Sequence, residues 1–455
     1  MKNIVQRQRQ FFKDAKTLKV KFRKAQLRKL KATLNKYEGE IIEALKHDFE
    51  KPAFETFSTE IMVLDQEIDH ILANINNWSS TQRAKSARIN FPSKSYIKPQ
   101  PYGVTLVIGP WNYPVQLTLN PALGAIAAGN TVIIKPSEIA PHTSALLTKI
   151  INSNFNPGFL HVVEGDADTT QALLSQPLDY IFFTGSTHVG KIIMKAAAEQ
   201  LTPLTLELGG KSPTIVDETA DLELAAKRIA WGKFINAGQT CVSPDFVYVQ
   251  NSLHDKFCNL LKEHIRNFFG DNAAQSDDFA RIISDKHFHR LANLIDPSNV
   301  FYGGSTNPDT RYIEPTVLTN ISWDDPIMQE EIFGPILPIL RFNELNHIIE
   351  TLQSKSHPLA LYLFSTNKLN QKKVMHRLRF GGGCINDTVA HLGNPKLPFG
   401  GMGNSGFGSY HGKASFDTFS HPKSIMKKSN WLDIPLRYPP YEGKLNWLKK
   451  LKKFL

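Results

Sequence analysis

The feature that most limits the possible folds of this chain is an alternation of short apolar runs with longer helical stretches over residues 104–206. The apolar runs cover residues 104–108, 131–134, 160–163, 180–183 and 204–206. Such alternation predicts right-handed βαβ units and a parallel sheet covered by helices on both faces. Ligands of these sheets bind beyond the carboxyl ends of the strands, so the residues directly after each run are the first candidates for a site.

The segments on either side of this region extend the predicted α/β fold. Helices are expected over residues 5–37, 39–49 and 56–78, and a Pro-containing segment over 86–100 predicts an exposed hairpin. A second strand–helix region runs from Pro213 to about Phe399. A chain of 455 residues is too long for one small core, so two or three domains are expected.

One uncharged segment is long enough on paper to span a membrane. No Asp, Glu, Lys or Arg occurs from Pro99 to Ile134, but Pro110, Pro114 and Pro121 interrupt the run. We therefore expect a strand, a loop and a helix buried inside a domain rather than a span. Three widely spaced cysteines and the lack of an apolar signal segment predict a reduced protein in the cytoplasm.

Positive charge is concentrated at the two ends of the chain. The net charge is +11, and residues 1–36 hold thirteen Lys or Arg and one acid. Near the C-terminus, Leu445, Leu448, Leu451 and Leu455 recur at near-helical spacing with Lys between them, which predicts a basic amphipathic helix. These ends could bind an anionic surface of lipid or nucleic acid. We favour solvated helices whose apolar stripes dock on the body, because no nucleic-acid-reading module accompanies the charge. No nucleic-acid partner is expected.

A glycine-containing turn follows the run 180–183. Gly185, Gly190 and Lys191 match the phosphate loop of nucleoside triphosphatases, but Ile192 replaces the Ser or Thr that binds magnesium. The dinucleotide pattern G-x-G-x-x-G is matched at its outer positions, with Thr187 in the middle place. The missing hydroxyl favours a dinucleotide on the helix N-terminus, and a kinase or ATPase remains an alternative. Glycine at a tight strand–helix turn is also ordinary packing.

Cys241 is the candidate nucleophile. It lies on the connection between a helical run, 222–235, and the predicted strand 246–249, where a thiol can be partly exposed and its thiolate stabilised by amide dipoles. Cys258 and Cys384 lack this setting, and we expect them to pack in the core. Taken alone, Cys241 could also be structural.

Two polar residues at predicted strand ends could assist this thiol. Asn112 lies in a loop made rigid by two prolines and a tryptophan, which suits an amide donor for a developing oxyanion. Glu207 follows the run 204–206 and could act as a general base on water. It could instead form an ion pair with Lys211 or cap a helix.

Three further residues could bind a dinucleotide. Lys135 follows a buried strand and could donate to ribose hydroxyls, or be a surface charge. Glu331 could accept from a second ribose, with Phe333 packed on a flat ring. No residue is assigned to a metal ion.

These segments together resemble a known family. The segments are Pro110-Trp-Asn-Tyr-Pro114, Lys135-Pro-Ser-Glu138, Phe183-Thr-Gly-Ser186, Glu207-Leu-Gly-Gly-Lys211, Gly238-Gln-Thr-Cys241 and Glu331-Ile-Phe-Gly-Pro335. In this order they resemble the signature set of NAD(P)-dependent aldehyde dehydrogenases. Ile385-Asn-Asp387 and the glycine-rich segment 397–412 are similar to the class 3 and fatty aldehyde branch.

The resemblance implies a domain layout and an oligomeric state. A Rossmann-like parallel-sheet cofactor domain would comprise residues 1–81 and 103–208, and an α/β catalytic domain residues 209–399. A small β oligomerisation hairpin and arm would comprise 82–102 and 400–430 and make a homodimer. Residues 431–455 would be a basic amphipathic tail. Membrane-anchored relatives continue past a segment like Arg437-Tyr-Pro-Pro440 into an apolar tail, so here residues 443–455 are expected to make at most peripheral contact or a lid.

The resemblance also implies residue roles. Cys241 would attack an aldehyde, Asn112 and the Cys241 N–H would bind the oxyanion, and Glu207 would activate water. Ser186 with the turn from Gly185 to Gly190 would bind the pyrophosphate of NAD or NADP. Lys135, Glu138 and Glu331 would bind the riboses, and Phe333 would pack beside them. A CoA-acylating enzyme, in which CoA resolves the thioester, is the nearest alternative activity.

Overall fold

The first sheet of the protein is the predicted parallel sheet. The computed structural model describes residues 1–452. The strands are β3 (Val104–Ile108), β4 (Thr131–Lys135), β5 (Leu160–Val162), β6 (Tyr180–Thr184), β7 (Leu204–Glu207) and β17 (Gly406–Phe407). They lie in the order β17-β7-β6-β3-β4-β5, and only β17 runs antiparallel to its neighbour. Every residue of β3, β4 and β6 is buried, as expected for strands covered on both faces.

The direction in which the chain crosses this sheet changes at β3. The strands β4 and β5 lie on one side of β3, whereas β6 and β7 lie on the other. Residue Ile108 at the end of β3 is therefore paired with Lys135 on one side and Phe183 on the other. Such a reversal opens a crevice beyond the carboxyl ends of the strands, which is where open α/β sheets bind ligands.

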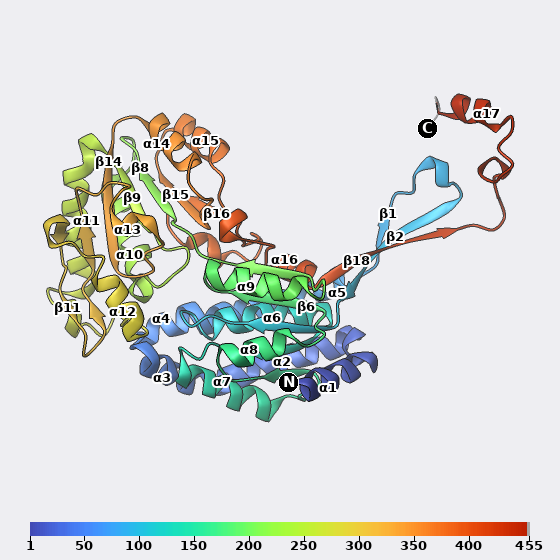
Figure 1. Ribbon diagram of the computed structural model, residues 1–455, viewed down its shortest axis with the longest axis horizontal. Helices are drawn as coiled ribbons and strands as arrows, with labels where there is room; N and C mark the ends of the chain where they lie inside the picture. Colours follow the sequence, from blue (N-terminus) through green and yellow to red (C-terminus); the bar gives the residue numbers. More distant parts are fainter. Residues whose placement is uncertain (453–455) are drawn as a thin grey trace.

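The helices around this sheet explain the uncharged segment. Helix α6 (Gln116–Ala128) is buried along its whole length, so charge in it would be costly. It is covered by α2 (Val20–Lys36), α5 (Met62–Trp78) and α16 (Gly412–Thr418) (Figure 1). The strand–loop–helix prediction is confirmed. No helix within residues 1–452 is both long and apolar enough to cross a membrane.

The other helices of this unit lie toward the N-terminus and around the sheet. They are α1 (Lys2–Lys13), α3 (Glu38–Phe49), α4 (Ala53–Thr56), α7 (Pro141–Asn154), α8 (Ala167–Leu174) and α9 (Thr187–Ala198). The single helix predicted over 5–37 is wrong, because Ala15 adopts a left-handed φ of 58° and breaks the chain between α1 and α2. A π-helical turn, Phe57–Ile61, also separates α4 from α5.

The second unit is built around a seven-stranded sheet in the order β10-β13-β14-β9-β8-β15-β16. Its strands are β8 (Pro213–Val216), β9 (Phe246–Gln250), β10 (Val300–Tyr302), β13 (Thr316–Leu318), β14 (Ile336–Phe342), β15 (Ala360–Phe364) and β16 (Gly382–Ile385). The helices are α10 (Leu222–Phe234), α11 (His254–Phe269), α12 (Asp285–Ala292), α13 (Pro326–Gln329), α14 (Leu345–Gln353) and α15 (Lys368–Arg377). A separate ladder pairs β11 (Thr306–Asn307) with β12 (Tyr312–Ile313).

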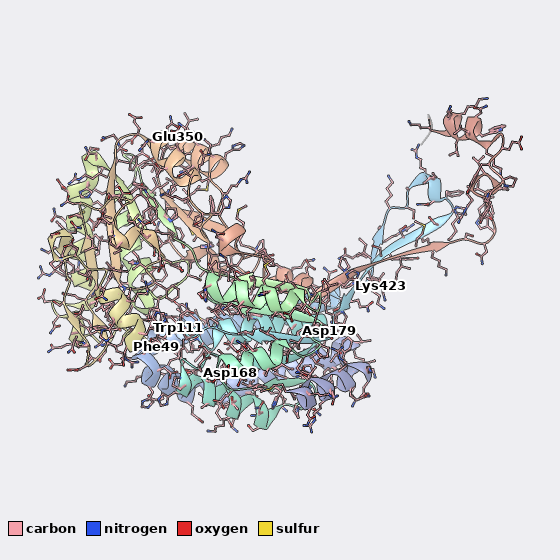
Figure 2. The ribbon with its side chains drawn as sticks, in the orientation of Figure 1. Phe49, Trp111, Asp168, Asp179, Glu350 and Lys423 are labelled. Carbon is pink, nitrogen blue, oxygen red and sulfur yellow. The ribbon has the colours of Figure 1, made fainter. Side chains whose placement is uncertain are left out.

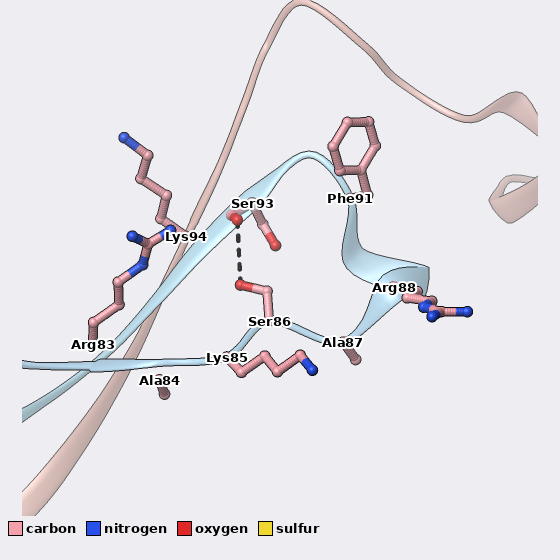
Figure 3. A pocket seen from close by; sticks show the side chains of 9 residues that line it. All are labelled: Arg83, Ala84, Lys85, Ser86, Ala87, Arg88, Phe91, Ser93 and Lys94. Carbon is pink, nitrogen blue, oxygen red and sulfur yellow. Dashed lines mark hydrogen bonds between the residues drawn. The ribbon is translucent and has the colours of Figure 1, made fainter.

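A three-stranded sheet projects from the body as an arm (Figure 1). It consists of β1 (Gln82–Ala84), β2 (Ser93–Pro101) and β18 (Ser420–Lys428), and every residue of β18 is paired with β2. The loop at the tip is stabilised by a hydrogen bond from Ser86 to the carbonyl of Ser93 (Figure 3). Its neighbours Arg83, Lys85 and Lys94 leave this end of the arm strongly basic.

The tail continues past the arm, away from the body (Figure 1). Helix α17 (Lys444–Leu451) confirms the predicted amphipathic helix, but Leu445 and Leu448 are exposed. The expectation that this stripe docks on the body is therefore wrong at the C-terminus, because the arm carries α17 beyond the reach of the core. At the N-terminus it is confirmed, since Val5 of α1 is buried. The predicted position Leu455 lies outside the described residues.

Candidate active site

Cys241 lies on an unusual connection between α10 and β9. Three successive residues before it, Asn236, Ala237 and Gly238, have left-handed φ angles of 55°, 50° and 71°. At Gly238 a side chain would also collide, because an added Cβ would lie 2.3 Å from the carbonyl oxygen of Gly334. Left-handed residues other than glycine cost free energy and cluster at functional sites. This turn presents the half-buried thiol of Cys241 to the interior.

Two cavities meet at Cys241. One, of about 290 Å³, is lined by Asn112, Glu207, Glu331 and Phe333 and by the turn after β6. The other, of about 620 Å³, is lined mainly by apolar and aromatic side chains. Cys241 belongs to both linings. Molecules bound in the two cavities could therefore meet at one sulfur atom.

Asn112 is fixed against the Cys241 connection. Its Nδ2 donates a hydrogen bond of 2.9 Å to the carbonyl of Gln239, and Asn236 Nδ2 donates one of 3.0 Å to the carbonyl of Asn112. A side-chain amide carries two N–H groups, so one remains for a ligand. The loop also packs across the boundary between the units, because the Trp111 ring lies 5.3 Å from that of Phe333 (Figure 2). The structure thus places Asn112 beside Cys241, as predicted.

Glu207 ends β7 with both carboxylate oxygens unpaired. The residue is 2% exposed, and within residues 1–452 neither oxygen has a hydrogen-bond partner. The ion pair with Lys211 is not formed, because Lys211 Nζ lies 2.6 Å from Asp245. Burial therefore raises the pKa of the Glu207 carboxyl well above its usual value. A buried acid without a partner, facing a cavity, is a candidate general base for a water or ligand in that cavity.

The charge state of Cys241 differs from the expectation of a stabilised thiolate. The N–H groups of Cys241 and Val242 do lower the pKa of the thiol, but burial and the carboxylates of Glu331 and Glu207 raise it to about 12. The thiol is therefore protonated in this structure. Its ionisation needs a base or a nearby positive charge.

The residues predicted to bind a dinucleotide fall into two groups. Gly185, Ser186, Glu331 and Phe333 line the smaller cavity with the catalytic candidates. The donor set fits a dinucleotide, because α9 starts directly after Ser186 with its N-terminus at the crevice between β3 and β6. Thr184 lines the same cavity, and its buried hydroxyl has no hydrogen-bond partner among the residues that the structure describes.

Lys135, Glu138 and Gly190 do not line that cavity. Lys135 ends β4 at the same edge of the sheet, and its Nζ lies 2.6 Å from the Glu138 carboxylate. At Gly190 an added Cβ would lie 2.7 Å from the side chain of Leu208. Glycine there lets α9 pack closely on β7, which agrees with the packing alternative for that residue.

The loop that bears Glu331 is held from three sides. Lys211 Nζ donates to the carbonyls of Ile327 (2.9 Å) and Glu330 (3.0 Å). The N–H of Ile332 donates to Asp245 over 2.9 Å, and Arg290 donates to the carbonyl of Ile332. Lys211 and Asp245 therefore connect the segment after β7 to this loop, a role that the sequence did not indicate.

The sequence also gave no sign of three residues near α4. Lys51 and Glu60 form a fully buried ion pair of 2.8 Å, and Glu60 accepts the N–H groups of Val115 and Gln116 at the start of α6. Glu55 accepts the N–H of Asn236 over 2.9 Å. Glu60 lies in the π-helical turn, which a helical pattern over 56–78 does not reveal.

The other two cysteines lie outside both cavity linings. Cys258 is 1% exposed, as predicted for a core residue. Cys384 is only half-buried, and its sulfur lies 3.5 Å from Nδ1 of His391, so the core prediction holds only in part.

Comparisons with known proteins give the family and the fold. The profile of the family described as the aldehyde dehydrogenase family matches residues 1–425. The chain is 48% identical over 441 residues to the 4,4'-diaponeurosporen-aldehyde dehydrogenase of Staphylococcus aureus (strain NCTC 8325 / PS 47), covering 96% of each chain. It is 43% identical over 445 residues to the dimeric NADP-preferring aldehyde dehydrogenase of Mus musculus, covering 97% of this chain and 98% of that one. The solved substrate-bound state of Staphylococcus aureus AldH superposes with a TM-score of 0.97 at 47% identity, covering 99% of both chains.

Proposed function

Because the chain belongs to the aldehyde dehydrogenase family, we propose that Cys241, Glu207 and Asn112 perform its NAD(P)-dependent oxidation of aldehydes to carboxylic acids. The observation that carries this assignment is the position of Cys241 between the two cavities. The apolar cavity receives the aldehyde, and the smaller cavity receives the nicotinamide end of the cofactor. The nucleophile is thus within reach of both reactants.

The chemistry divides among the three residues. The Cys241 thiol gives its proton to water, its sulfur bonds to the aldehyde carbon, and the carbonyl oxygen becomes an oxyanion. The free N–H of Asn112 and the N–H of Cys241 donate to that oxyanion. NAD or NADP, when bound, supplies the hydride acceptor that converts the adduct to a thioester. Glu207 then takes a proton from water, the water oxygen bonds to the thioester carbon, and the sulfur leaves as the acid forms.

Four groups of the smaller cavity and two beyond it would hold the cofactor. Ser186 and the Gly185 turn, at the N-terminus of α9, would face the pyrophosphate. Glu331 and Phe333 would contact the nicotinamide ribose and ring, and Lys135 and Glu138 the adenine-side ribose. Gly190 would contribute by letting α9 approach β7.

The cavity supports apolar aliphatic or aromatic aldehydes as substrates, because its wall is mostly hydrophobic and aromatic. The experiment that tests the function is reduction of NAD and NADP, followed at the absorbance of the reduced cofactor, with aldehydes of graded chain length. Each reaction is run with and without CoA. Turnover with water alone supports hydrolysis, in keeping with the unpaired Glu207. Turnover that depends on CoA would identify the CoA-acylating alternative, and no turnover with any aldehyde would refute the proposal.

The arm supports assembly as a homodimer. Its β18 strand has a free outer edge, and Ile97, Ile425 and Met426 are exposed on a sheet that projects from the body. An unpaired strand edge can pair with another chain, and exposed apolar patches mark interaction sites. We place the cofactor domain at 1–81 and 103–208, the catalytic domain at 209–399 and the oligomerisation element at 82–102 and 400–430. Within that element only β1, β2 and β18 form the arm, whereas β17 and α16 pack on the cofactor domain. Sedimentation equilibrium of the wild type and of Met426→Lys tests the dimer, which the variant should weaken.

A peripheral role for the tail is favoured by one observation. Leu445, Trp447 and Leu448 are exposed in α17 beside Lys449 and Lys450, which suits contact with an anionic lipid surface. Co-sedimentation with phosphatidylglycerol vesicles, compared with a chain lacking 443–455, tests this contact. Loss of binding in the shortened chain is expected, and equal binding would exclude the tail. Within this proposal the enzyme works in the cytoplasm.

A further inference from the structure

We infer that Glu55 determines the charge selectivity of the aldehyde cavity, so that the enzyme accepts neutral and cationic aldehydes and discriminates against those that carry a carboxylate. This inference rests on the proposed function, in which the larger cavity receives the aldehyde. Glu55 lies in α4 and contributes its side chain to the wall of that cavity. Glu55 is not one of the proposed catalytic residues, which are the nucleophile, the oxyanion donor and the general base.

The charge balance of the wall is one-sided. Two acidic residues, Glu55 and Asp278, line the cavity, and within residues 1–452 no Lys or Arg lines it. The nearby cation Lys51 is already paired with Glu60, and both side chains are fully buried. A carboxylate on a substrate would have to leave water and approach a like charge without a cationic partner.

The two acids differ in how strongly solvent screens them. Asp278 is exposed, so water and salt weaken its field. Glu55 is half-buried in a mostly apolar wall, where charges interact more strongly. Its Oε2 accepts the N–H of Asn236 over 2.9 Å, which holds the carboxylate in place near the Cys241 connection. Glu55 is therefore the residue whose charge a substrate experiences.

The rest of the wall suits a cation as well as a neutral chain. Tyr113, Trp231, Phe268 and Phe269 present aromatic rings to the cavity. The faces of such rings attract ammonium groups, and quaternary ammonium ligands are bound in this way in other proteins. A cationic aldehyde would meet both these rings and the Glu55 carboxylate, so its charge would not be penalised.

The ionisation of Glu55 makes the selectivity depend on pH. The pKa of Glu55 is raised to about 7, because burial and, to a smaller degree, Asp278 raise it more than Lys51 and the Asn236 N–H lower it. The wall also contains Tyr113, Tyr410, Cys241 and His411. Burial raises the pKa of both tyrosines and of the Cys241 thiol, and it lowers the pKa of His411 to about 4, so these four groups stay neutral between about pH 6 and 8.5. Discrimination against carboxylates should therefore be weak in mildly acidic solution and strong in alkaline solution.

The test compares two pairs of aldehydes of matched shape. The anionic pair is adipic semialdehyde and its neutral partner, the methyl ketone in which a methyl group replaces one of the two carboxylate oxygens. The cationic pair is trimethylammonio-butanal and the aldehyde in which a tert-butyl group replaces the trimethylammonium group. For the wild type at about pH 8.5, kcat/KM for adipic semialdehyde should be lower than for its neutral partner by about tenfold or more. The cationic aldehyde should match or exceed its partner.

Glu55→Gln is the decisive variant, because its amide oxygen still accepts the N–H of Asn236 while the charge is lost. In this variant the ratio of kcat/KM for the neutral partner to kcat/KM for adipic semialdehyde should be about tenfold smaller than in the wild type. The control Asp278→Asn should leave this ratio unchanged. An unchanged ratio in Glu55→Gln overturns the inference.

The wild type gives a second, independent result. The same kcat/KM ratio, measured for the wild type, should decrease when the pH is lowered from about 8.5 to about 6, because Glu55 becomes protonated while the substrate carboxylate stays ionised. A pH-independent ratio, or equal kcat/KM within the anionic pair, overturns the inference even if Glu55→Gln does not fold. Failure of the proposed function would look different, since the wild type would then oxidise neither neutral aldehyde.

Discussion

The side-chain amide of Asn112 donates a hydrogen bond of 2.9 Å to the carbonyl of Gln239, two residues before Cys241. This bond joins the loop after β3 to the connection that carries the nucleophile, and the two residues lie 127 positions apart in the chain. It orients the amide plane before any substrate binds, and Asn112 lines the smaller cavity together with Cys241. Preorganised donors of this kind stabilise transition states without reorganisation during the reaction.

Asn112→Ala removes the preoriented donor. We expect kcat to fall about 100- to 1,000-fold, because one oxyanion donor typically contributes about 2.7–4 kcal/mol to lowering the barrier. Steady-state kinetics with a neutral aldehyde measures the change. Asn152→Ala, on α7 and outside both cavities, is the matched control and should retain wild-type kcat. A loss of less than about threefold in Asn112→Ala would exclude the role.

Cys241→Ser should abolish aldehyde oxidation while NAD or NADP still binds. A serine hydroxyl is a far weaker nucleophile than a thiolate at neutral pH, but it leaves the shape of the smaller cavity unchanged. Titration of cofactor by protein fluorescence measures binding, and absorbance of the reduced cofactor measures turnover. Cys384→Ser should keep near-normal turnover. Near-normal turnover in Cys241→Ser would instead refute the assignment of the nucleophile.

Glu207→Gln should stop the reaction after the thioester forms. The amide cannot take a proton from water, so hydride transfer occurs once per site and hydrolysis becomes slow. Rapid-mixing experiments should show a burst of reduced cofactor approaching one equivalent of enzyme, without steady turnover. Steady turnover at the wild-type rate would show that another group activates water.

The pH dependence of kcat should reflect Glu207. Burial raises the pKa of its carboxyl well above the usual value, so the active carboxylate form is lost as the pH falls through that raised pKa. We therefore expect kcat to rise with pH in a range well above that in which an ordinary Glu titrates, at about 4.3. A profile of kcat between about pH 5.5 and 9.5 checks this. A flat profile over that range would contradict it.

The Lys51–Glu60 ion pair should matter for stability more than any surface pair. Glu60→Gln leaves the Lys51 ammonium buried without its counterion, which typically costs about 3–5 kcal/mol. Urea denaturation, followed by tryptophan fluorescence, measures the apparent free energy of unfolding. The control Glu40→Gln breaks the exposed Lys149–Glu40 pair and should leave the curve unchanged. Equal curves for the two variants would show that the buried pair contributes little.

Much of the fold and site could be predicted from local pattern. Apolar runs at 104–108, 131–134 and 180–183 predicted parallel strands, and the carboxyl ends of parallel strands share one edge. This rule alone brought Asn112 and Glu207 to the same crevice. Cys241 was harder to place, because its position depends on a turn of left-handed residues, two of which are not glycine. The resemblance to known motifs, rather than any periodicity, singled it out.

Other properties depended on contacts that no local pattern reveals. The break at Ala15 and the π-helical turn at Phe57–Ile61 lie inside stretches with an uninterrupted helical pattern. The neutral thiol of Cys241 follows from burial beside Glu207 and Glu331, which are distant in sequence. The exposed leucines of α17 follow from the direction in which the arm leaves the body.

The amino-acid sequence by itself determined the α/β alternation, the edge of the sheet at which polar residues gather and the motifs of the family. Only the tertiary structure decided that Lys211 pairs with Asp245 rather than Glu207, and that Glu55 lines the larger cavity beside Cys241. The physical reason is the distance along the chain over which each property is determined. Strand and helix patterns reflect the burial of near neighbours along the chain, whereas the pairing and ionisation of a charged group depend on whichever groups the completed fold brings around it.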